Sequence, residues 1–581
     1  EDRPGDRRLV AYVVGAEGAG APSSTALRSH LQTRLPDYMI PATFVDLKDL
    51  PLTGTGKVDR RSLPRPEGER PELASEFIEP RTAVEKELAR IWSGVLGVDR
   101  IGVHDNFFEL GGHSMQAVQM VSRVRDAMHV ELPLPALFEA PTVAQLAQVV
   151  EILLATGAYE STERVDFEAE AVLDPAITGS GRRPAAAGEP SAVFLTGGTG
   201  FLGAHLLHDL LERIPGEVYC LVRAKSPEEG TARLRSSLST FGLWEPSRAS
   251  RIIPVPGDLG QKHFGLTESA WSTLAESVDV IYHNGALVNF FYPYSMLKAV
   301  NVDGTKEVLA LACEGRLRPV HFVSTISVFP IRIDSGDRTI REQSAIETIQ
   351  VPGGGYSQSK WVAERLVAQA RDRGVPVAIY RPGRVSGHSR TGASNDEDIL
   401  PKMLKALVQL GSLPAVGSEV LVDLTPVDYV SRAIVHLSTR EESVGRTFHL
   451  VNPNPIRVAD LLAWMRSYGY PIERLPVERF RHALEAYAKK SRSAALASFL
   501  RDAARRTAQR GRGAERPAAA DREPVRFECR NTLDGLRGSS IVCPPVDDAL
   551  LGTYFDHYIR NGFPAPPGAP SPAGRGSAHA G

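Results

Sequence analysis

The sequence predicts a multidomain chain with a small α+β piece, a four-helix bundle and a large α/β domain built on a parallel sheet. The length of 581 residues exceeds what one hydrophobic core usually holds. Amphipathic helical runs follow one another between 80 and 155. After 191, short apolar runs typical of strands alternate with segments long enough for crossover helices. The chain therefore combines units of different fold classes.

Charge and cysteine usage exclude several classes of protein. With 67 basic and 69 acidic residues, the chain offers no basic field for nucleic acid. No apolar stretch approaches the roughly 18 residues that a membrane span needs. The four cysteines form no C-x-x-C pair, which argues against a disulfide framework and a zinc site. We expect a soluble, cytoplasmic protein with no metal, no nucleic-acid partner and no membrane partner.

Residues 1–66 form the predicted α+β piece. RLVAYVV indicates a strand, STALRSHLQTRL an amphipathic helix, and MIPATFVDLKDLPL an extended pair before the turn TGTGKVDRRSLP. The stretch from LPDYMIP to RRSLP closely resembles the C-terminal subdomain of adenylation domains of nonribosomal peptide synthetases. The resemblance implies that Lys57 matches the lysine that stabilises the acyl-adenylate reaction there. Since the large adenylation core does not precede it, we expect no adenylation by this piece, and we expect the chain to be a fragment of a larger polypeptide.

Residues 67–79 are rich in proline and charge and predict a linker, and 80–155 predict the helical bundle. Its helical runs are TAVEKELARIWSGVLG, with the threonine as N-cap, then SMQAVQMVSRVRDAM, LPALFEA and TVAQLAQVVEILLA. About 75 residues of this kind are typical of a small four-helix bundle.

Ser114 follows two glycines in DNFFELGGHSMQAVQM, at the start of the second long helix. A serine there is most often an N-cap, but the glycines leave the hydroxyl open and the positive helix end favours a phosphodiester. Residues 80–152 closely resemble peptidyl and acyl carrier domains at their phosphopantetheine attachment motif. The resemblance implies 4′-phosphopantetheine on Ser114, added by a phosphopantetheinyl transferase, and a tethered acyl or peptidyl thioester as its cargo.

Residues 156–190 are acidic and then rich in glycine, proline and alanine, with only DFEAEAVLD hinting at order. This composition predicts a linker. A flexible tether would make delivery of the carrier's cargo an intramolecular step at high effective concentration.

The large domain, residues 191–568, is organised around the βαβ unit AVFLTGGTGFLGAHLLHDLLERIPGEVYCLVR. Its glycines stand at G-x-x-G-x-x-G spacing where strand gives way to helix, as a pyrophosphate site requires. Later strands close at Asp258, Leu259 and Asn284, which we expect on the adenine and ribose side. The predicted cofactor-binding residues are Gly197, Thr199, Gly200, Phe201, Leu202, Gly203, Arg223, Arg233, Asp258, Leu259, Asn284 and Lys360.

Arg223 closes the second strand, about 20 residues past the glycines, where NAD-dependent proteins usually carry an acidic residue. A positive charge at this position suits a 2′-phosphate, and Lys225 and Arg233 are close in sequence. The sequence therefore predicts NADPH rather than NADH as cofactor.

Tyr356 and Lys360 stand in GGYSQSKWVAERLV at i and i+4, hence on one face of a predicted helix, and Thr325 ends the fifth strand in VSTISVF. A phenol of ordinary pKa near 10 is a poor acid, but a neighbouring ammonium lowers that pKa. We therefore expect Tyr356 to act as general acid, Lys360 to assist it and to hold the nicotinamide ribose, and Thr325 to hold the substrate oxygen.

Residues 191–568 look like an extended short-chain dehydrogenase/reductase. They resemble more closely the thioester reductase domains that terminate peptide synthetases, polyketide synthases and carboxylic acid reductases. The matching segments are TGGTGFLG, LVRA, HNGALVN, NVDGT, FVSTISV, YSQSKWVAE, RPGRVSG and CPPVDDALLGTYFDHYIRNGF. The resemblance implies Thr325, Tyr356 and Lys360 as the catalytic set, while Asn301 in NVDGT is open between a structural and a catalytic role.

From about residue 390 the chain predicts a smaller substrate-binding subdomain, including DLTPVDYVSRAIVHLS and a helical run near 456–505. The segment RRTAQRGRGAERPAAADREP predicts a disordered insertion, and residues 569–581 a disordered tail.

A carrier domain followed by a reductase domain predicts reductive off-loading of the carrier's cargo. A thioester on the Ser114 arm would be reduced with NADPH to a hemithioacetal that collapses to an aldehyde, and a second round would give the alcohol. Upstream synthetase modules would supply the acyl or peptidyl group. Two alternatives stay open: a carboxylic acid reductase with the same domain order, and a redox-inactive release or scaffold domain.

Overall fold

The computed structural model describes residues 10–15, 76–112, 114–156, 165–182, 190–330, 339–346, 350–395, 398–414, 420–476 and 525–567, with short pieces between 22 and 64 and near 480. The chain divides into two compact units, Glu1–Arg164 with Arg481–Arg506, and Val165–Phe480 with Thr507–Gly581. No helix in the described ranges has both the length and the apolar character to cross a bilayer.

In the first unit, the α+β piece is described only in part. Strand β1 (Val10–Val13) pairs in parallel with β2 (Thr43–Asp46). Leu52 and Val58 form an antiparallel bridge across the turn that carries the exposed Lys57. The expected strands are therefore present, whereas much of the predicted helix at 24–35 lies outside the described residues.

Residues 80–156 fold as the predicted four-helix bundle, comprising α2 (Ala83–Leu96), α3 (Ser114–Met128), α4 (Leu134–Glu139) and α5 (Val143–Thr156). Thr82 caps α2 in a reciprocal capping box with Glu85, so the predicted N-cap is confirmed. Trp92 and Phe107 meet edge to face at the centre of the bundle core. Ser114 is the first residue of α3, which is where the sequence placed it.

The second unit is built on a parallel sheet of seven strands in the order β14-β9-β7-β6-β3-β4-β5. The strands are β3 (Ala192–Thr196), β4 (Glu217–Val222), β5 (Ile252–Pro256), β6 (Val280–His283), β7 (Val320–Val323), β9 (Val377–Pro382) and β14 (Thr447–Leu450). Strand β3 lies between β4 and β6, so the winding reverses there. Such a reversal is where a ligand crevice opens in a doubly wound fold.

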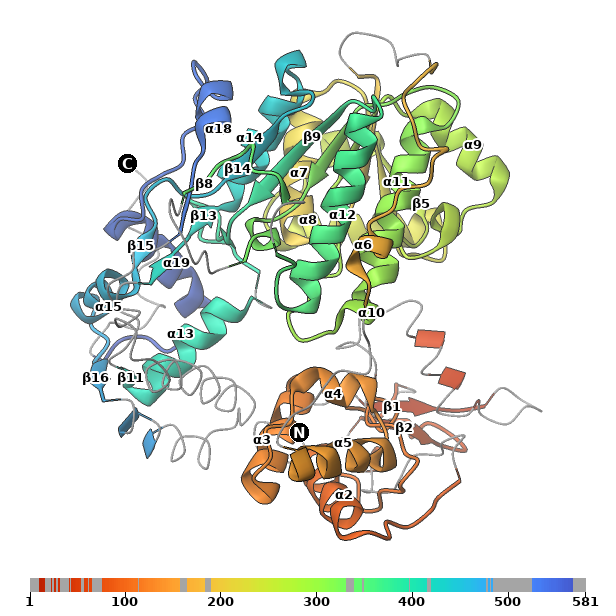
Figure 1. Cartoon of the computed structure of the whole chain (residues 1–581), viewed down its shortest axis with the longest axis vertical. Coiled ribbons are helices and arrows are strands. Elements are labelled where there is room, and N and C mark those ends of the chain that lie inside the picture. Colours follow the sequence, from red (N-terminus) through yellow and green to blue (C-terminus); the bar gives the residue numbers. More distant parts are fainter. Residues whose placement is uncertain are drawn as a thin grey trace. The chain divides into compact units, whose positions relative to one another are not determined.

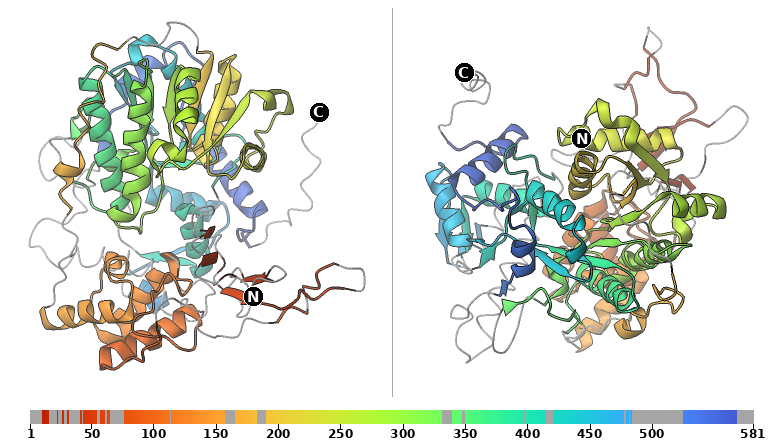
Figure 2. Two further views of the ribbon diagram at one scale, coloured as in Figure 1. Left: turned by 90° about the vertical axis from the view of Figure 1, so that its right-hand side faces the viewer. Right: turned by 90° about the horizontal axis from the view of Figure 1, so that it is seen from above.

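Two helical layers cover the sheet (Figure 2, left). One hydrophobic core packs α7 (Phe201–Arg213), α8 (Pro227–Thr240) and α14 (Val427–Ser438) on the first face. The other packs α9 (Glu268–Ser277), α11 (Gly304–Cys313) and α12 (Gly355–Asp372), the last two side by side in Figure 1. The predicted parallel doubly wound sheet is confirmed. Helix α14 belongs to this sandwich because its apolar face packs on α7, so assigning VDYVSRAIVHLS to the smaller subdomain was wrong.

The remaining elements form short two-stranded pairs and helices after β9. The pairs are β10 (Val385–Ser386) with β13 (Thr425–Pro426), β11 (Ser412–Pro414) with β16 (Glu473–Leu475), β12 (Leu421–Val422) with β15 (Ile456–Arg457), and β17 (Arg526–Phe527) with the earlier β8 (Thr339–Ile340). The helices are α13 (Ile399–Leu410), α15 (Val458–Ser467), α18 (Arg530–Gly535) and α19 (Asp548–Arg560). The predicted insertion at 505–524 and the tail at 569–581 lie outside the described residues.

The predicted linker 156–190 contains an ordered segment, residues 165–182, which we call the strap. Its helix α6 (Phe167–Glu170) contacts α10 (Tyr294–Lys298): the Tyr294 hydroxyl donates to the Glu170 carboxylate at 2.9 Å, and Phe167 packs edge to face on Tyr294. Leu173 is fully buried in the core beneath α12. The hint of order in DFEAEAVLD is therefore confirmed, and the tether prediction was wrong for the rest of the strap, because the strap's side chains find partners within the second unit.

Removing the buried anchor of the strap should destabilise the second unit. Leu173→Ala deletes a fully buried side chain, and such changes cost about 2–5 kcal/mol. Denaturant unfolding of the full chain measures the loss. Val172→Ala is the matched control, because Val172 is 61% exposed. Equal stability of the two variants would contradict the packing of the strap.

Candidate active site

The glycine turn between β3 and α7 forms a close-packed cradle. Gly197 has a φ of +74°, which favours glycine, and the N–H of Gly200 donates to the carbonyl of Gly197 at 3.0 Å. A Cβ on Gly203 would lie 1.9 Å from the Gly197 carbonyl oxygen. The helix thus begins directly against the turn, and its first N–H groups are available to an anion.

Asn284, at the end of the neighbouring strand β6, reaches the same turn. Its Nδ2 lies 3.5 Å from the Gly197 carbonyl oxygen. At the sheet edge, Asp258 accepts a hydrogen bond from the Gly260 N–H at 2.9 Å and so shapes the turn after β5. The side chain of Leu259 is buried in the core, so a ligand contact there would come from its backbone.

The two arginines of the predicted phosphate site are brought together. Arg223 follows β4 directly and is exposed. Arg233, from α8, donates a hydrogen bond to the Arg223 carbonyl oxygen. The carbonyl of Thr199 in the glycine turn accepts a hydrogen bond from Ser237, also on α8, at 2.9 Å. Helix α8 therefore links the glycine turn to the positively charged strand end.

Tyr356 lies in the first turn of α12, which packs against the loop before α10. A Cβ on Gly355 would lie 2.3 Å from the Tyr292 carbonyl oxygen. The half-buried Tyr356 ring meets Phe290 edge to face, with centroids 5.3 Å apart, and Phe290 is 62% exposed. Phe290 was not among the residues predicted for the site, although the aromatic cluster NFFYPY after a strand end was a signal.

Lys360 is buried one turn further along α12. Its Nζ donates to the Val323 carbonyl oxygen at 2.8 Å and lies 4.3 Å from the centroid of the Phe322 ring. These contacts place the ammonium at the carboxyl end of β7. Burial lowers the pKa of Lys360 to about 8, and the charge of Glu364 opposes this shift.

The expected lowering of the phenol pKa is not found. Burial raises the pKa of Tyr356 to about 12. The prediction that Lys360 lowers this pKa is therefore wrong for this structure, since loss of water around the phenol dominates and the lysine hydrogen bond goes to a backbone carbonyl. Phenol and ammonium are nevertheless on one helix face, as predicted.

Thr325 lies two residues beyond β7 and caps a short 3₁₀ turn, Ile326–Val328. Its Oγ1 accepts a hydrogen bond from the Ser327 N–H at 3.2 Å and lies 3.2 Å from the Ser327 hydroxyl. The side chain is half-buried. Because Lys360 binds the carbonyl of Val323, the threonine and the lysine share the end of one strand.

Asn301 sits in a π-helical turn, Ala299–Asp303, and is 2% exposed. Its carbonyl oxygen accepts from the Leu287 N–H at 2.7 Å, and its amide donates to the Leu287 carbonyl and to the Ser359 hydroxyl at 3.1 and 2.9 Å. These bonds fasten the loop after β6 to α12, which supports the structural role that the sequence left open.

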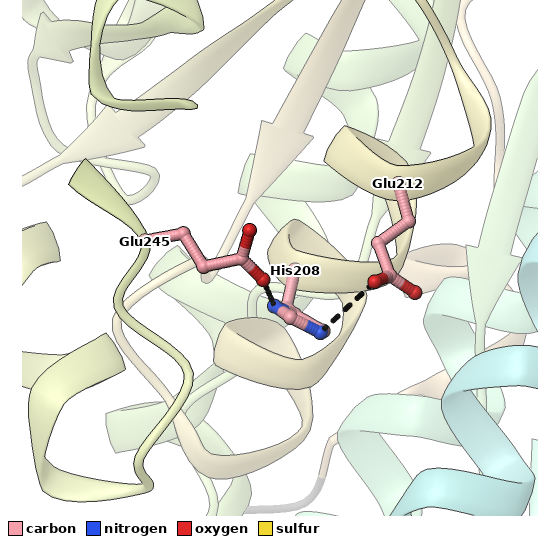
Figure 3. A group of neighbouring side chains, drawn as sticks. All are labelled: His208, Glu212 and Glu245. Atoms are coloured by element: carbon pink, nitrogen blue, oxygen red, sulfur yellow. Dashed lines mark ion pairs between the residues drawn. The ribbon is translucent and has the colours of Figure 1, made fainter. Parts of the chain in front are cut away.

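A histidine and two carboxylates gather elsewhere on the unit, a group that the sequence did not foresee (Figure 3). On α7, Nε2 of His208 lies 3.7 Å from Oε1 of Glu212, and Nδ1 of the same ring lies 3.7 Å from Oε1 of Glu245. Arg248 pairs with the same two carboxylates at 3.4 and 3.0 Å. A guanidinium thus already supplies positive charge to this group, which we interpret as a surface ion-pair network.

Three family profiles match the chain. "Male sterility protein", an NAD-binding family, matches residues 195–434, "Phosphopantetheine attachment site" matches 86–150, and "AMP-binding enzyme C-terminal domain" matches 1–57. The matches follow the order of the three regions that the sequence predicted.

Similar proteins include a linear gramicidin synthase of Brevibacillus parabrevis, 41% identical over 97% of this chain and 11% of that protein. Isonitrile lipopeptide synthase of Streptomyces coeruleorubidus is 34% identical over 97% of this chain and 39% of that protein. Among solved structures, the terminal R domain from the myxalamid PKS-NRPS pathway is 44% identical, with a TM-score of 0.63, covering 69% of this chain and 99% of that one.

The fold and the site define an NAD(P)-binding reductase of the extended short-chain dehydrogenase/reductase type, joined to a carrier domain. The chain belongs to the family of terminal reductase modules of nonribosomal peptide synthetases. It spans 11% and 39% of the length of the two synthetases that it matches.

Proposed function

We propose that this chain releases an acyl or peptidyl group, held as a thioester on phosphopantetheine at Ser114, by reduction with NADPH to an aldehyde. The observation that carries the proposal is that Thr325 and Lys360 both lie at the carboxyl end of β7, with Tyr356 on the same helix face as the lysine. A carrier domain in the same chain supplies the tethered substrate. The lengths of the matched synthetases support upstream modules as the source of the acyl group.

The residues at the glycine turn fit a dinucleotide. A side chain on Gly203 would collide with the turn, and without one the helix N-terminus is open to a pyrophosphate. The N–H groups of Phe201, Leu202 and Gly203 would hold that pyrophosphate, and Arg223 and Arg233 would hold a 2′-phosphate. NADPH supplies hydride when bound.

Tyr356 is the proton donor to the substrate carbonyl oxygen in this proposal. With a pKa of about 12 the phenol stays protonated at neutral pH, which is the form a general acid needs. The ammonium of Lys360 would stabilise the phenolate left after proton transfer, and the hydroxyl of Thr325 would orient the carbonyl oxygen. Both interactions act on charge that develops in the transition state.

Ser114 would carry the phosphopantetheine, attached by a phosphopantetheinyl transferase. As the first residue of α3 it places a phosphodiester at the positive end of a 15-residue helix. We also place the start of the reductase at the strap, near residue 165, rather than at 191.

Product analysis tests the proposed function. The carrier is loaded with an acyl-phosphopantetheine by a transferase, NADPH is added, and the released product is identified by mass. We expect aldehyde or alcohol with matching oxidation of NADPH. Release of a free acid, or a cyclic product without NADPH oxidation, would refute the reductive assignment.

Arg223 should set the preference for the phosphorylated cofactor. Arg223→Ser removes a charge-assisted contact to the 2′-phosphate, and we expect the ratio of NADPH to NADH affinity to fall about 10- to 100-fold. Fluorescence titration with both cofactors measures the ratio. Arg235→Ser on α8 is the control, because this arginine stacks over Trp244. An unchanged ratio in Arg223→Ser would contradict the assignment.

A further inference from the structure

Glu364 is a buried carboxylate on the helix that carries Tyr356 and Lys360. The three residues are spaced at i, i+4 and i+8 on α12, so they share a face. The Glu364 side chain is only 1% exposed. A charge this deep needs strong partners, and its position beside the proposed catalytic pair calls for an explanation.

The carboxylate of Glu364 has two partners, one on β9 and one directly after β7. Its Oε1 accepts hydrogen bonds from Nε and Nη2 of Arg381, on β9, at 2.9 and 2.5 Å. Its Oε2 accepts a hydrogen bond from the hydroxyl of Ser324. Ser324 directly precedes Thr325 at the end of β7, so Glu364 links α12 to the strand end that presents the threonine.

Arg381 is held by several partners. Its Nη1 lies 3.3 Å from the Glu342 carbonyl oxygen and 3.3 Å from His449 Nε2, and its guanidinium stacks over Phe329. The arginine side chain is 4% exposed. This packing fixes the position of the Glu364 carboxylate, because neither member of the pair can turn toward solvent.

Among the residues that the structure describes, the groups that face Lys360 leave Glu364 as its source of negative charge. Tyr356 on α12 is a neutral phenol, and burial keeps the pKa of His283 on β6 at about 3, so this imidazole is neutral as well. Arg381 on β9 is paired with Glu364. His449 on β14 lies 3.3 Å from Arg381 and is neutral, because burial lowers its pKa to about 3.

The Glu342 carboxylate accepts hydrogen bonds from the backbone N–H groups of His449, Asn531 and Thr532.

We propose that Glu364 is a positioning residue of the reductase: it joins the strand end that carries Thr325 to the helix that carries Tyr356, and it supplies the negative charge that faces the Lys360 ammonium. This inference rests on the proposed function. A purely structural ion pair would affect only stability. A positioning role also changes how cofactor binding and turnover depend on pH.

The test is the NADPH dissociation constant between pH 6 and 10, measured by fluorescence titration without acyl substrate. In the unaltered chain we expect affinity to weaken as pH rises through about 8, where Lys360 loses its proton. Glu364→Gln removes the charge that favours the ammonium, so we expect the midpoint to move down by about one pH unit. An unchanged midpoint, with only a lower unfolding temperature, would overturn the inference.

Two further variants separate the possible failures. Ser324→Ala keeps the Glu364 charge, so we expect the same midpoint pH as in the unaltered chain. We expect its turnover number to be several-fold lower, and an unchanged turnover number would overturn the link to Thr325. Lys360→Met should abolish the pH dependence. If the dependence persists there, the role of Lys360 in the proposed function fails, and the inference with it.

An unpaired buried arginine can prevent folding of Glu364→Gln. In that case the double variant Glu364→Gln/Arg381→Gln removes both charges and is measured in the same way. Loss of the Arg381 cation opposes the effect of losing the Glu364 charge, so a smaller downward shift would support the inference, and an unchanged or raised midpoint would overturn it.

Discussion

Tyr356→Phe should reduce carrier-dependent oxidation of NADPH by about 10²- to 10⁴-fold, the usual contribution of a positioned general acid. The substitution deletes one oxygen. Among the described residues that phenol oxygen makes no hydrogen bond, so its loss should leave the stability of the chain and the affinity for NADPH unchanged. Turnover number, cofactor affinity and unfolding temperature are measured on the same preparation.

Tyr219→Phe is the matched control for this prediction. The Tyr219 hydroxyl donates to the Glu217 carboxylate at 3.0 Å near the start of β4, at the opposite end of that strand from Arg223. The control variant should keep full turnover. If Tyr356→Phe also keeps full turnover, the phenol is not the proton donor and the proposed mechanism is wrong.

Ser114→Ala should abolish release of a tethered substrate entirely, because no other residue is expected to accept phosphopantetheine. The same variant should still reduce a soluble pantetheine thioester at the rate of the unaltered chain, since the reductase is intact. Comparison of the two substrates separates the loss of delivery from the loss of chemistry. Mass spectrometry of the chain reports whether the arm is present.

The soluble substrate should be used less efficiently than the tethered one even in the unaltered chain. A tether keeps its cargo at an effective concentration in the millimolar range for short flexible linkers. Ser93→Ala, on α2 of the same bundle, should load and release normally. Loading of Ser114→Ala with phosphopantetheine would show that another serine carries the arm.

The direction of the pKa shift of Tyr356 could not be predicted from the sequence. Spacing on α12 correctly put Tyr356 and Lys360 on one face, because helix periodicity is a local property. The direction of the pKa shift depends on what surrounds the phenol, and burial there is created by segments distant in sequence, such as the Phe290 loop.

The order of the whole strap could not be predicted from the sequence either. Its acidic, alanine-containing sequence is locally compatible with a tether, and its order depends on partners almost 200 residues away. The Gln369 side chain accepts a hydrogen bond from the Leu173 N–H at 3.2 Å, and the Arg373 guanidinium donates to the Leu173 carbonyl at 3.2 Å. The composition of a segment does not indicate which distant residues it will contact.

The sequence by itself determined the order of the three regions, the parallel sheet, the glycine turn, and the shared helix face of the tyrosine and the lysine. These features depend on the hydrophobic period of strands and helices and on turn-forming residues, which are properties of residues close together in the sequence. Only the tertiary structure decided that Glu364 and Arg381 form a buried pair behind the lysine, that Asn301 fastens a loop, and that the strap joins the reductase. Those features depend on burial and on contacts between distant segments, which exist only after the chain has folded.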